Sequence, residues 1–171
     1  MTFGKFLPIA LMTGALAFTI QILDQVLSGS MPIENNLGFG WIAFIAWPSY
    51  FLAGGTIDGG LKVFFGFLIG IAASIAIMEM AALTGDALGF FAVPAAIFVL
   101  VTICICLERF PPFDLVPAMF IGAGIFFGAM TYVPGASYLS VTLTEMTYCV
   151  IGLFYGWMTV FLRTKYEKFI N

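Results

Sequence analysis

Three acidic residues lie inside or at the end of long apolar stretches of the sequence: Asp24, Glu79 and Glu145. A carboxyl group in an apolar medium is costly, and it often marks a place where protons or ions are handled. No lysine or arginine lies in the outer half of the predicted spans, where these acids are placed, so the sequence offers no ion-pair partner for them. Two interpretations stay open, an acidic vestibule at the outer membrane surface and simple solvated helix ends.

Two further segments combine groups that could guide a solute. Hydroxyl groups can replace the hydration of a neutral molecule, large aromatic rings can form a constriction, and glycines allow close approach of backbones. These segments predict a solute path lined by Trp47, Pro48, Ser49, Tyr50, Phe51, Gly54, Gly55, Pro117, Phe120, Gly122 and Gly124.

Two stripes at helical spacing add polar groups to otherwise apolar stretches. The first combines Thr13, Ala17, Gln21 and Asp24, and the second follows Glu145 through Cys149, Gly152 and Gly156, with Tyr148, Tyr155 and Thr159 alongside. Because polar groups facing lipid are costly, we expect these stripes to face a bundle interior, a subunit interface or a water-filled path. The glycines themselves are typical of close helix packing.

The elements that must position these residues are membrane helices. Of the 171 residues, 62% are apolar and only 9% are charged, which excludes a soluble globule and a disordered chain. The net charge of −3 argues against nucleic-acid binding, and the absence of histidine argues against a histidine-based catalytic or zinc site. An all-α fold in one transmembrane domain is expected, with six spans over residues 6–27, 37–55, 61–83, 88–107, 115–133 and 141–162.

The distribution of basic residues predicts the orientation of the chain. All six lie in the tails or in the even-numbered loops: Lys5, Lys62, Arg109, Arg163, Lys165 and Lys168. Positive residues concentrate on the cytoplasmic side of membrane proteins, so both termini are expected in the cytoplasm.

A shared pattern indicates an internal repeat of residues 1–85 and 86–171. After Pro48 and after Pro117, phenylalanine follows at plus three, a small residue at plus six and glycine at plus seven. With three helices in each half, the halves would insert with opposite orientation, as in many transporters. Chance agreement is the alternative, since phenylalanine and glycine are abundant here. Only Pro48 lies deep enough in its span to kink it.

The run from Trp47 to Gly55, together with the run around Pro117 to Gly122, resembles the YcdZ-like small bacterial inner-membrane proteins, a family of unknown function. Met119 departs from this pattern, because a small residue is expected before Phe120. The resemblance implies a compact multi-pass protein of the bacterial inner membrane. It implies no catalytic residue and no substrate.

The leading hypothesis is a channel or facilitator for a small, mostly uncharged solute, acting as a homo-oligomer in the lipid bilayer. The alternative is a non-transporting membrane scaffold or accessory subunit. An enzyme is disfavoured, because the sequence has no histidine, no paired carboxylates at active-site spacing within the spans and no arrangement of serine with lysine inside a span. No cofactor, metal or nucleic-acid partner is expected, and Cys104, Cys106 and Cys149 are interpreted as inert buried thiols.

Overall fold

A computed structural model of the chain describes residues 2–33 and 38–170, and all regular structure in these ranges is helical. The all-α fold class is therefore confirmed. The predicted start of the second span, at residue 37, lies outside the described residues. In chain order the elements are α1 (Phe3–Leu27), the 3₁₀ turn η1 (Ser28–Ser30), α2 (Gly40–Leu52), α3 (Ile57–Leu88), η2 (Gly89–Phe91), α4 (Ala92–Leu107), α5 (Val116–Tyr132) and α6 (Tyr138–Ile170).

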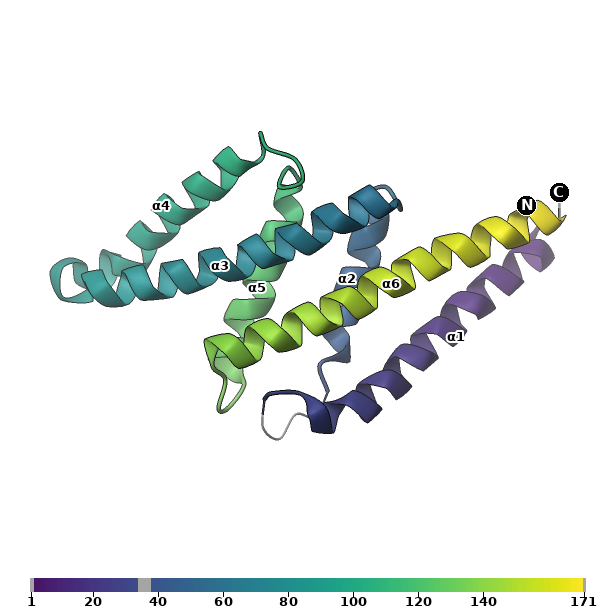
Figure 1. The fold of residues 1–171 in the computed structure, drawn as a ribbon, viewed down its shortest axis with the longest axis horizontal. Helices are drawn as coiled ribbons and strands as arrows, with labels where there is room; N and C mark the ends of the chain where they lie inside the picture. The colour runs from purple at the N-terminus through teal and green to yellow at the C-terminus, as the bar shows by residue number, and fades with distance from the viewer. Residues whose placement is uncertain (1, 34–37, 171) are drawn as a thin grey trace.

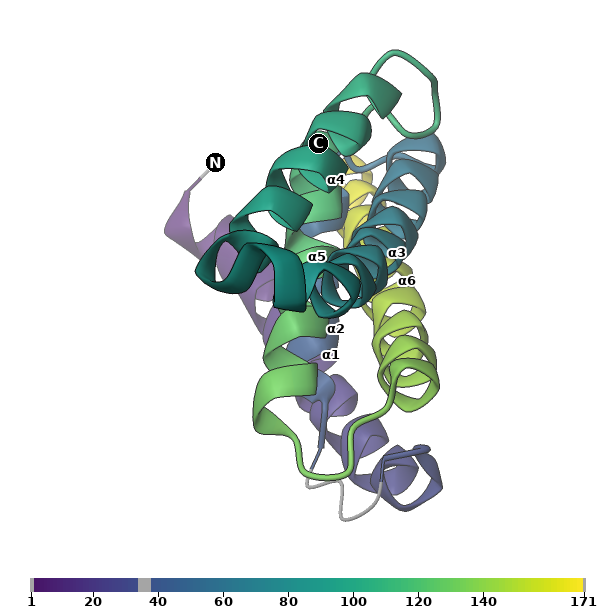
Figure 2. The same ribbon diagram turned by 90° about the vertical axis from the view of Figure 1, so that its left-hand side faces the viewer.

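The helices form an elongated bundle built on two crossings (Figure 1). Helix α2 packs chiefly against α6, and α5 packs chiefly against α3, while the two long helices α3 and α6 also meet each other. Helix α4 lies along α3 and α1 lies more loosely along α6, so each forms one flank of the bundle (Figure 2). The buried core runs through both crossings.

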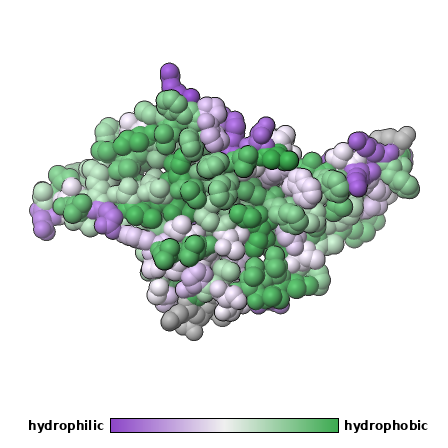
Figure 3. All heavy atoms as spheres, viewed as in Figure 1, coloured by the Kyte–Doolittle hydropathy of each residue, from purple (hydrophilic) through white to green (hydrophobic). Residues whose placement is uncertain are grey.

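Three stretches of the described chain are long and apolar enough to cross a membrane: Phe3–Ser30, Ile57–Leu107 and Tyr138–Ile170. The second contains α3 and α4 joined by η2, and the helices Gly40–Leu52 and Val116–Tyr132 are apolar but shorter. Apolar side chains cover most of the visible surface, and hydrophilic residues gather at its extremities (Figure 3). These features are compatible with a membrane protein.

The predicted boundaries need correction at several places. Helix α3 begins at Ile57, before the predicted start at residue 61, and α6 continues to Ile170, beyond the predicted end at residue 162. The expected break at residues 84–86 is helical, because α3 continues to Leu88 and the chain turns at Gly89, whose φ is +50°. The second span was expected to reach Gly55, but α2 ends at Leu52. Gly54 and Gly55 follow with φ of +95° and +65°, and the Gly55 amide donates to the Tyr50 carbonyl at 2.9 Å, which closes the helix end.

Close backbone contact at glycines makes both crossings possible. A Cβ added at Gly152 of α6 would lie 2.4 Å from the Ala43 carbonyl oxygen of α2. A Cβ added at Gly70 of α3 would lie 2.2 Å from the Met119 carbonyl oxygen of α5. Real Cβ atoms cannot approach an oxygen so closely, so only glycine fits at either position. This bears out the packing interpretation of the glycines at these two positions.

Two contacts tie distant basic residues to other parts of the chain. Lys5 Nζ lies 3.4 Å from the Ile170 carbonyl oxygen, so the first and last described helices come together at one end. Lys62, near the start of α3, forms an ion pair of 2.5 Å with Asp114 in the α4–α5 loop. The hydrogen bond donated by the Lys62 ammonium holds the pKa of the Asp114 carboxyl below its usual range.

The three cysteines are all free, but their burial differs from the prediction. Cys149 is buried, whereas Cys104 is only partly buried and Cys106 is exposed on α4. The expectation of three buried thiols is therefore correct for Cys149 alone. Cys106 points outward because α4 packs on α3 with only one of its faces.

Candidate functional site

Polar side chains from three helices meet where α6 passes α1 and α2. The Trp47 indole nitrogen of α2 donates to Thr159 Oγ1 of α6 at 3.0 Å, and that hydroxyl donates to the Tyr155 carbonyl at 2.7 Å. The Trp47 ring also lies beside Tyr155, with ring centroids 6.0 Å apart. A buried indole N–H needs an acceptor, and here the acceptor is a side chain of another helix.

One turn away from this pair, α6 joins α1. The Tyr155 hydroxyl donates to Thr19 Oγ1 at 3.0 Å, and Thr19 in turn donates to the Leu16 carbonyl of its own helix at 2.8 Å. The Thr19 hydroxyl therefore acts as both acceptor and donor. The link couples two helices that otherwise pack loosely.

Asp24 organises the other end of the same interface. This carboxylate is only 4% exposed. It accepts from the Tyr148 hydroxyl at 2.5 Å, from the Phe39 amide at 3.0 Å and from Gln21 Nε2 at 3.3 Å. A Cβ at Gly38 would lie 2.3 Å from Asp24 Oδ2, so glycine is required for the chain to pass this close. Asp24 thus fastens the chain before α2 to both α1 and α6.

We call this interface the polar seam. On α6 its members recur at Tyr148, Tyr155 and Thr159, a spacing that keeps them on one helix face over about 16 Å at 1.5 Å per residue. Its members are Thr13, Thr19, Gln21 and Asp24 of α1, Trp47 of α2, and Tyr148, Tyr155 and Thr159 of α6.

A cleft of about 690 Å³ opens beside one end of the polar seam, between α1, α2 and α6. Thr13, Trp47 and Thr159 contribute polar groups to its wall, and Arg163 lies at its rim. A water molecule takes about 30 Å³ of liquid volume, so the cleft has room for a small solute with several waters. Most of the remaining wall is apolar.

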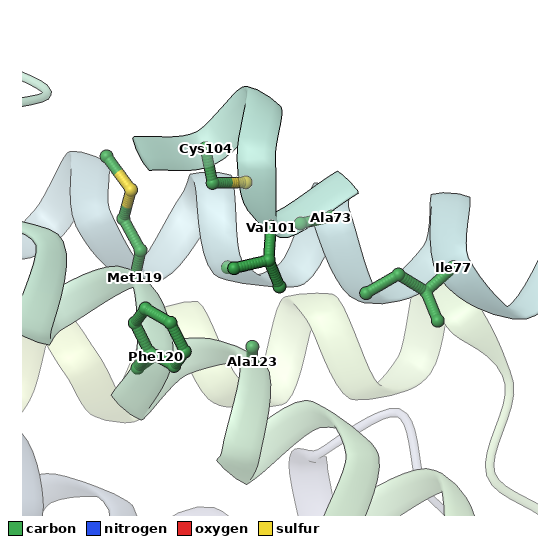
Figure 4. Close-up of a pocket in the computed structure, with 8 residues that line it drawn as sticks. Ala73, Ile77, Val101, Cys104, Met119, Phe120 and Ala123 are labelled. Atoms are coloured by element: carbon green, nitrogen blue, oxygen red, sulfur yellow. The ribbon is translucent and has the colours of Figure 1, made fainter. Parts of the chain in front are cut away.

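The second crossing offers a different environment. Between α3, α4 and α5 lies a pocket of about 40 Å³ whose wall includes Ala73, Val101, Cys104 and Phe120 (Figure 4). The cysteine thiol is the most polar side chain of that wall. A pocket of this size and polarity suits close packing and gives a solute little to bind.

The three predicted vestibule acids do not share one environment. Glu79 is exposed and accepts from the Tyr138 hydroxyl at 2.8 Å. Asp24 is buried and fully hydrogen-bonded, as described above. Glu145 is completely buried, and neither of its carboxyl oxygens has a hydrogen-bond partner in the described part of the chain. With two of the three enclosed, these acids do not line an open outer vestibule.

The first predicted path segment divides between buried and exposed positions. Trp47, Ser49 and Tyr50 are buried, and the Ser49 hydroxyl donates to the Ile45 carbonyl of its own helix at 2.8 Å. Phe51 is 41% exposed. Pro48 and Gly54 are exposed as well, while the half-buried Gly55 meets Val160 of α6.

The second predicted path segment faces mainly outward. Pro117 lies in the first turn of α5 and is exposed, as is Phe120 at 54%. Gly122 packs on the backbone of Phe67 in α3, and a Cβ at Gly124 would meet nothing within 4 Å. The two segments therefore belong to separate crossings and are not paired with each other.

Residues 10–164 match a family described as a protein of unknown function, DUF1097. The chain belongs to this family. No curated protein and no solved structure matches the sequence. Membership covers nearly the whole chain and assigns no activity to it, so function rests on the site itself.

The predicted polar stripes contain most members of the polar seam, but not all of its contacts follow from them. Asp24 of the first stripe accepts from Tyr148, as expected for a buried face, whereas Tyr155 bonds to Thr19, which lies outside the predicted stripe, and Gln21 of that stripe is exposed. No separate feature of the sequence indicated the hydrogen bond from Trp47 to Thr159. Two tyrosines and a threonine on one face of the last helix, matched by hydroxyl and acidic residues on the first, were the available clue.

Proposed function

We propose that the chain is a six-span facilitator of the bacterial inner membrane, with both termini in the cytoplasm, for a small and mostly uncharged solute. The observation that carries the proposal is the polar seam with its adjoining cleft. Phenol, hydroxyl and indole groups bond to one another across the contacts of α6 with α1 and α2, with Thr19 and Gln21 on the exposed side of α1, and such groups can replace the hydration of a neutral molecule without fixing an ion.

Helices α1, α3 and α6 are long enough to cross the hydrocarbon core, whereas α2, α4 and α5 have 13, 16 and 17 residues, fewer than the about 20 that an untilted span needs. The 32 residues of α3 and the 33 of α6 extend about 48 Å, which crosses a hydrocarbon core of about 30 Å with a steep tilt. The 13 residues of α2 extend only about 20 Å, but α2 crosses α6 and is largely buried in the bundle, where protein can cover its ends. The turn at η2 reverses the chain between α3 and α4, so the two can cross separately.

The contacts between basic and partner residues support the proposed orientation. Lys5 meets the end of α6, and Lys62 meets the loop between α4 and α5 that also carries Arg109. These contacts bring together pairs of segments that the positive-inside rule assigns to the cytoplasmic side.

The packing pattern supports an inverted repeat of residues 1–85 and 86–171. Helix α2 packs on α6 as α5 packs on α3, and α1 flanks α6 as α4 flanks α3. Ala46 meets Gly152 as Ala118 meets Gly66, each through its Cβ. The matched alanines are 72 positions apart and the matched glycines 86, whereas the prolines are 69 apart, so the proline motif is three residues out of register with the alanines.

Flux into liposomes tests the proposed function. Protein reconstituted in lipid should accelerate swelling in at least one neutral solute of a size series from urea to pentitols. Thr159→Val, which removes the acceptor for Trp47, should change that flux at least several-fold. Thr102→Val is the matched control, because Thr102 is exposed on α4 and bonds only within its own helix, to the Phe98 carbonyl at 2.7 Å.

The outcomes separate the two functional hypotheses. Flux that depends on Thr159 and not on Thr102 supports the facilitator. Absence of flux for every solute, from protein that is folded and inserted, overturns the facilitator and leaves the scaffold or accessory subunit. A homo-oligomer stays a prediction under either function, and light scattering in mild detergent decides it.

A further inference from the structure

Glu145 occupies an unusual position for a carboxyl group. It lies on α6 one turn before Tyr148 of the polar seam, with 0% of its surface exposed. Both of its oxygens lack a hydrogen-bond partner in the described ranges, and so does the hydroxyl of the neighbouring buried residue, Thr144. Three adjacent buried oxygens without partners are rare in folded proteins and call for a functional explanation.

No positive charge of the protein compensates Glu145. The nearest basic residue on α6 is Arg163, about 27 Å further along the helix at 1.5 Å per residue. Neither α2 nor α5 contains a lysine or arginine, and Lys62 of α3 is paired with Asp114. An ionised carboxylate enclosed in this way would be costly, because neither water nor a counter-charge stabilises it.

The other titratable groups around Glu145 add no positive charge either. On α6 they are the neighbouring tyrosine Tyr148 and, one turn on, the buried Cys149. From α1 comes the carboxylate of Asp24, held by Tyr148, and from α3 the exposed Glu79, held by Tyr138. The titratable group of α2 is Tyr50, near the C-terminal end of that helix. The titratable group of α5 is Tyr132, its last residue, which is exposed and lies outside the core.

The surroundings of Glu145 favour a proton over a metal ion. Hard cations such as Mg²⁺ and Ca²⁺ need about six oxygen ligands, and carboxylates usually supply several of them. Within the described chain, no group of three or more histidine, cysteine, aspartate or glutamate residues is placed to hold a metal. A proton needs only the carboxyl itself.

We propose that Glu145 is a proton-binding site inside the helix bundle, protonated at neutral pH and in exchange with protons of the surrounding solution. A purely structural acid would be fixed by hydrogen bonds, as Asp24 is, and Glu145 has none. The site goes beyond the proposed function, since a proton can bind here whether or not a solute crosses the bundle.

Infrared spectroscopy of the protein in lipid bilayers tests the site directly. The C=O stretching band of a protonated carboxyl should be present at pH 7, well above the ordinary pKa of about 4 of a solvent-exposed carboxyl group. It should disappear in Glu145→Gln and persist in Asp24→Asn, whose carboxylate has three donors. Transfer to D₂O should shift the band, because an exchanging proton is replaced by a deuteron.

Every outcome decides the proposal. Absence of the band at pH 7, or its persistence in Glu145→Gln, shows that Glu145 is not protonated and overturns the site. A band that does not shift in D₂O shows a locked proton and overturns exchange. The amide I band of the same spectra reports whether Glu145→Gln is folded. If that variant unfolds, the wild-type band and its deuterium shift still decide. Solute flux enters none of these measurements, so their result is separate from that of the facilitator.

Discussion

The crossing of α2 on α6 and the crossing of α5 on α3 are built alike and surrounded differently. Both depend on glycines whose neighbours approach too closely for any side chain, Gly152 in the first and Gly70 in the second. Around the first lie the polar seam and a cleft of about 690 Å³. Around the second lies a pocket of about 40 Å³ with an apolar wall.

This difference separates packing from chemistry. The crossing of α5 on α3 contains a buried hydroxyl, Ser74, which donates to the Gly70 carbonyl at 2.8 Å and lies 3.4 Å from the Ala123 carbonyl of α5. The linked side-chain bonds of the polar seam lie at the crossing of α2 on α6, so such a set of bonds is not required for a crossing to form. The concentration of these bonds at the crossing of α2 on α6 therefore points to a task for that half of the molecule.

The largest effect is expected from substitutions that disrupt either crossing. Gly152→Leu and Gly70→Leu should both prevent stable folding, because the new side chain has to enter backbone contacts of 2.4 and 2.2 Å. Overpacking of this kind costs about 1–3 kcal/mol or more. The yield of monodisperse protein in detergent measures it. Gly124→Leu is the control and should be tolerated, since nothing lies within 4 Å of its Cβ. If only one of the two variants failed to fold, the two crossings would not be equivalent.

The next effect contrasts the two buried acids near the polar seam. Asp24→Ala should lower the free energy of unfolding, because the Tyr148 hydroxyl and the Phe39 amide lose their acceptor, at about 1–3 kcal/mol for each buried group. Glu145→Met should leave stability equal or higher, because no hydrogen bond is lost. Denaturant midpoints in one detergent compare the variants. Equal losses of stability in Asp24→Ala and Glu145→Met would contradict the difference proposed between these two acids.

A smaller effect is expected from a single bond of the polar seam. Trp47→Phe keeps the ring in the bundle but removes the donor to Thr159, which should cost about 0.5–1.5 kcal/mol. If the solute passes along the polar seam, the Trp47→Phe variant should show a clear change in solute flux together with only this small loss of stability. A thermal midpoint and a flux rate measured on the same preparation give both values. A flux unchanged by Trp47→Phe and by Thr159→Val would remove this end of the polar seam from the path.

The smallest effect lies at the surface beside the crossing of α5 on α3. The ion pair with Lys62 lowers the pKa of Asp114, so its contribution to stability is present above the ordinary aspartate pKa of about 3.9 and is lost as the pH falls through the lower folded value. The thermal midpoint of Asp114→Asn should therefore lie slightly below wild type at pH 7 and meet it in stronger acid. A gap that persists in strong acid would show another role for Asp114.

The fold was predictable where hydrophobic length and glycine spacing decide it. Long apolar stretches predicted the helices, and the stripe of Gly66 and Gly70 predicted close packing before its partner was known. Boundaries were less predictable. Residues 84–86 look like a loop because they combine threonine, glycine and aspartate, yet Thr84 bonds back to the Met80 carbonyl at 2.8 Å and the helix continues.

The candidate site was predictable only in part. The spacing of residues in the sequence shows which side chains share one face of a helix, but it does not show which helix packs against that face. The polar faces of the first and last predicted helices were evident, but their meeting depends on how six helices pack. The proline motif drew attention to Pro117 and Gly124, which the structure exposes. The contrast between Asp24 and Glu145 was invisible, since it depends on the Phe39 amide and on Tyr148, which reach one acid and not the other.

The bond between Trp47 and Thr159 gives the molecule a built-in optical reporter. Trp41 and Trp157 are 44% and 41% exposed, whereas Trp47 is 5% exposed and forms part of the cleft wall. Replacing the two exposed tryptophans with phenylalanine would leave one indole whose emission depends on the cleft. Water or solute entering between α1 and α6 should then change its wavelength and its quenching by small molecules, and movements of the first helix could be followed in the bilayer without any attached dye.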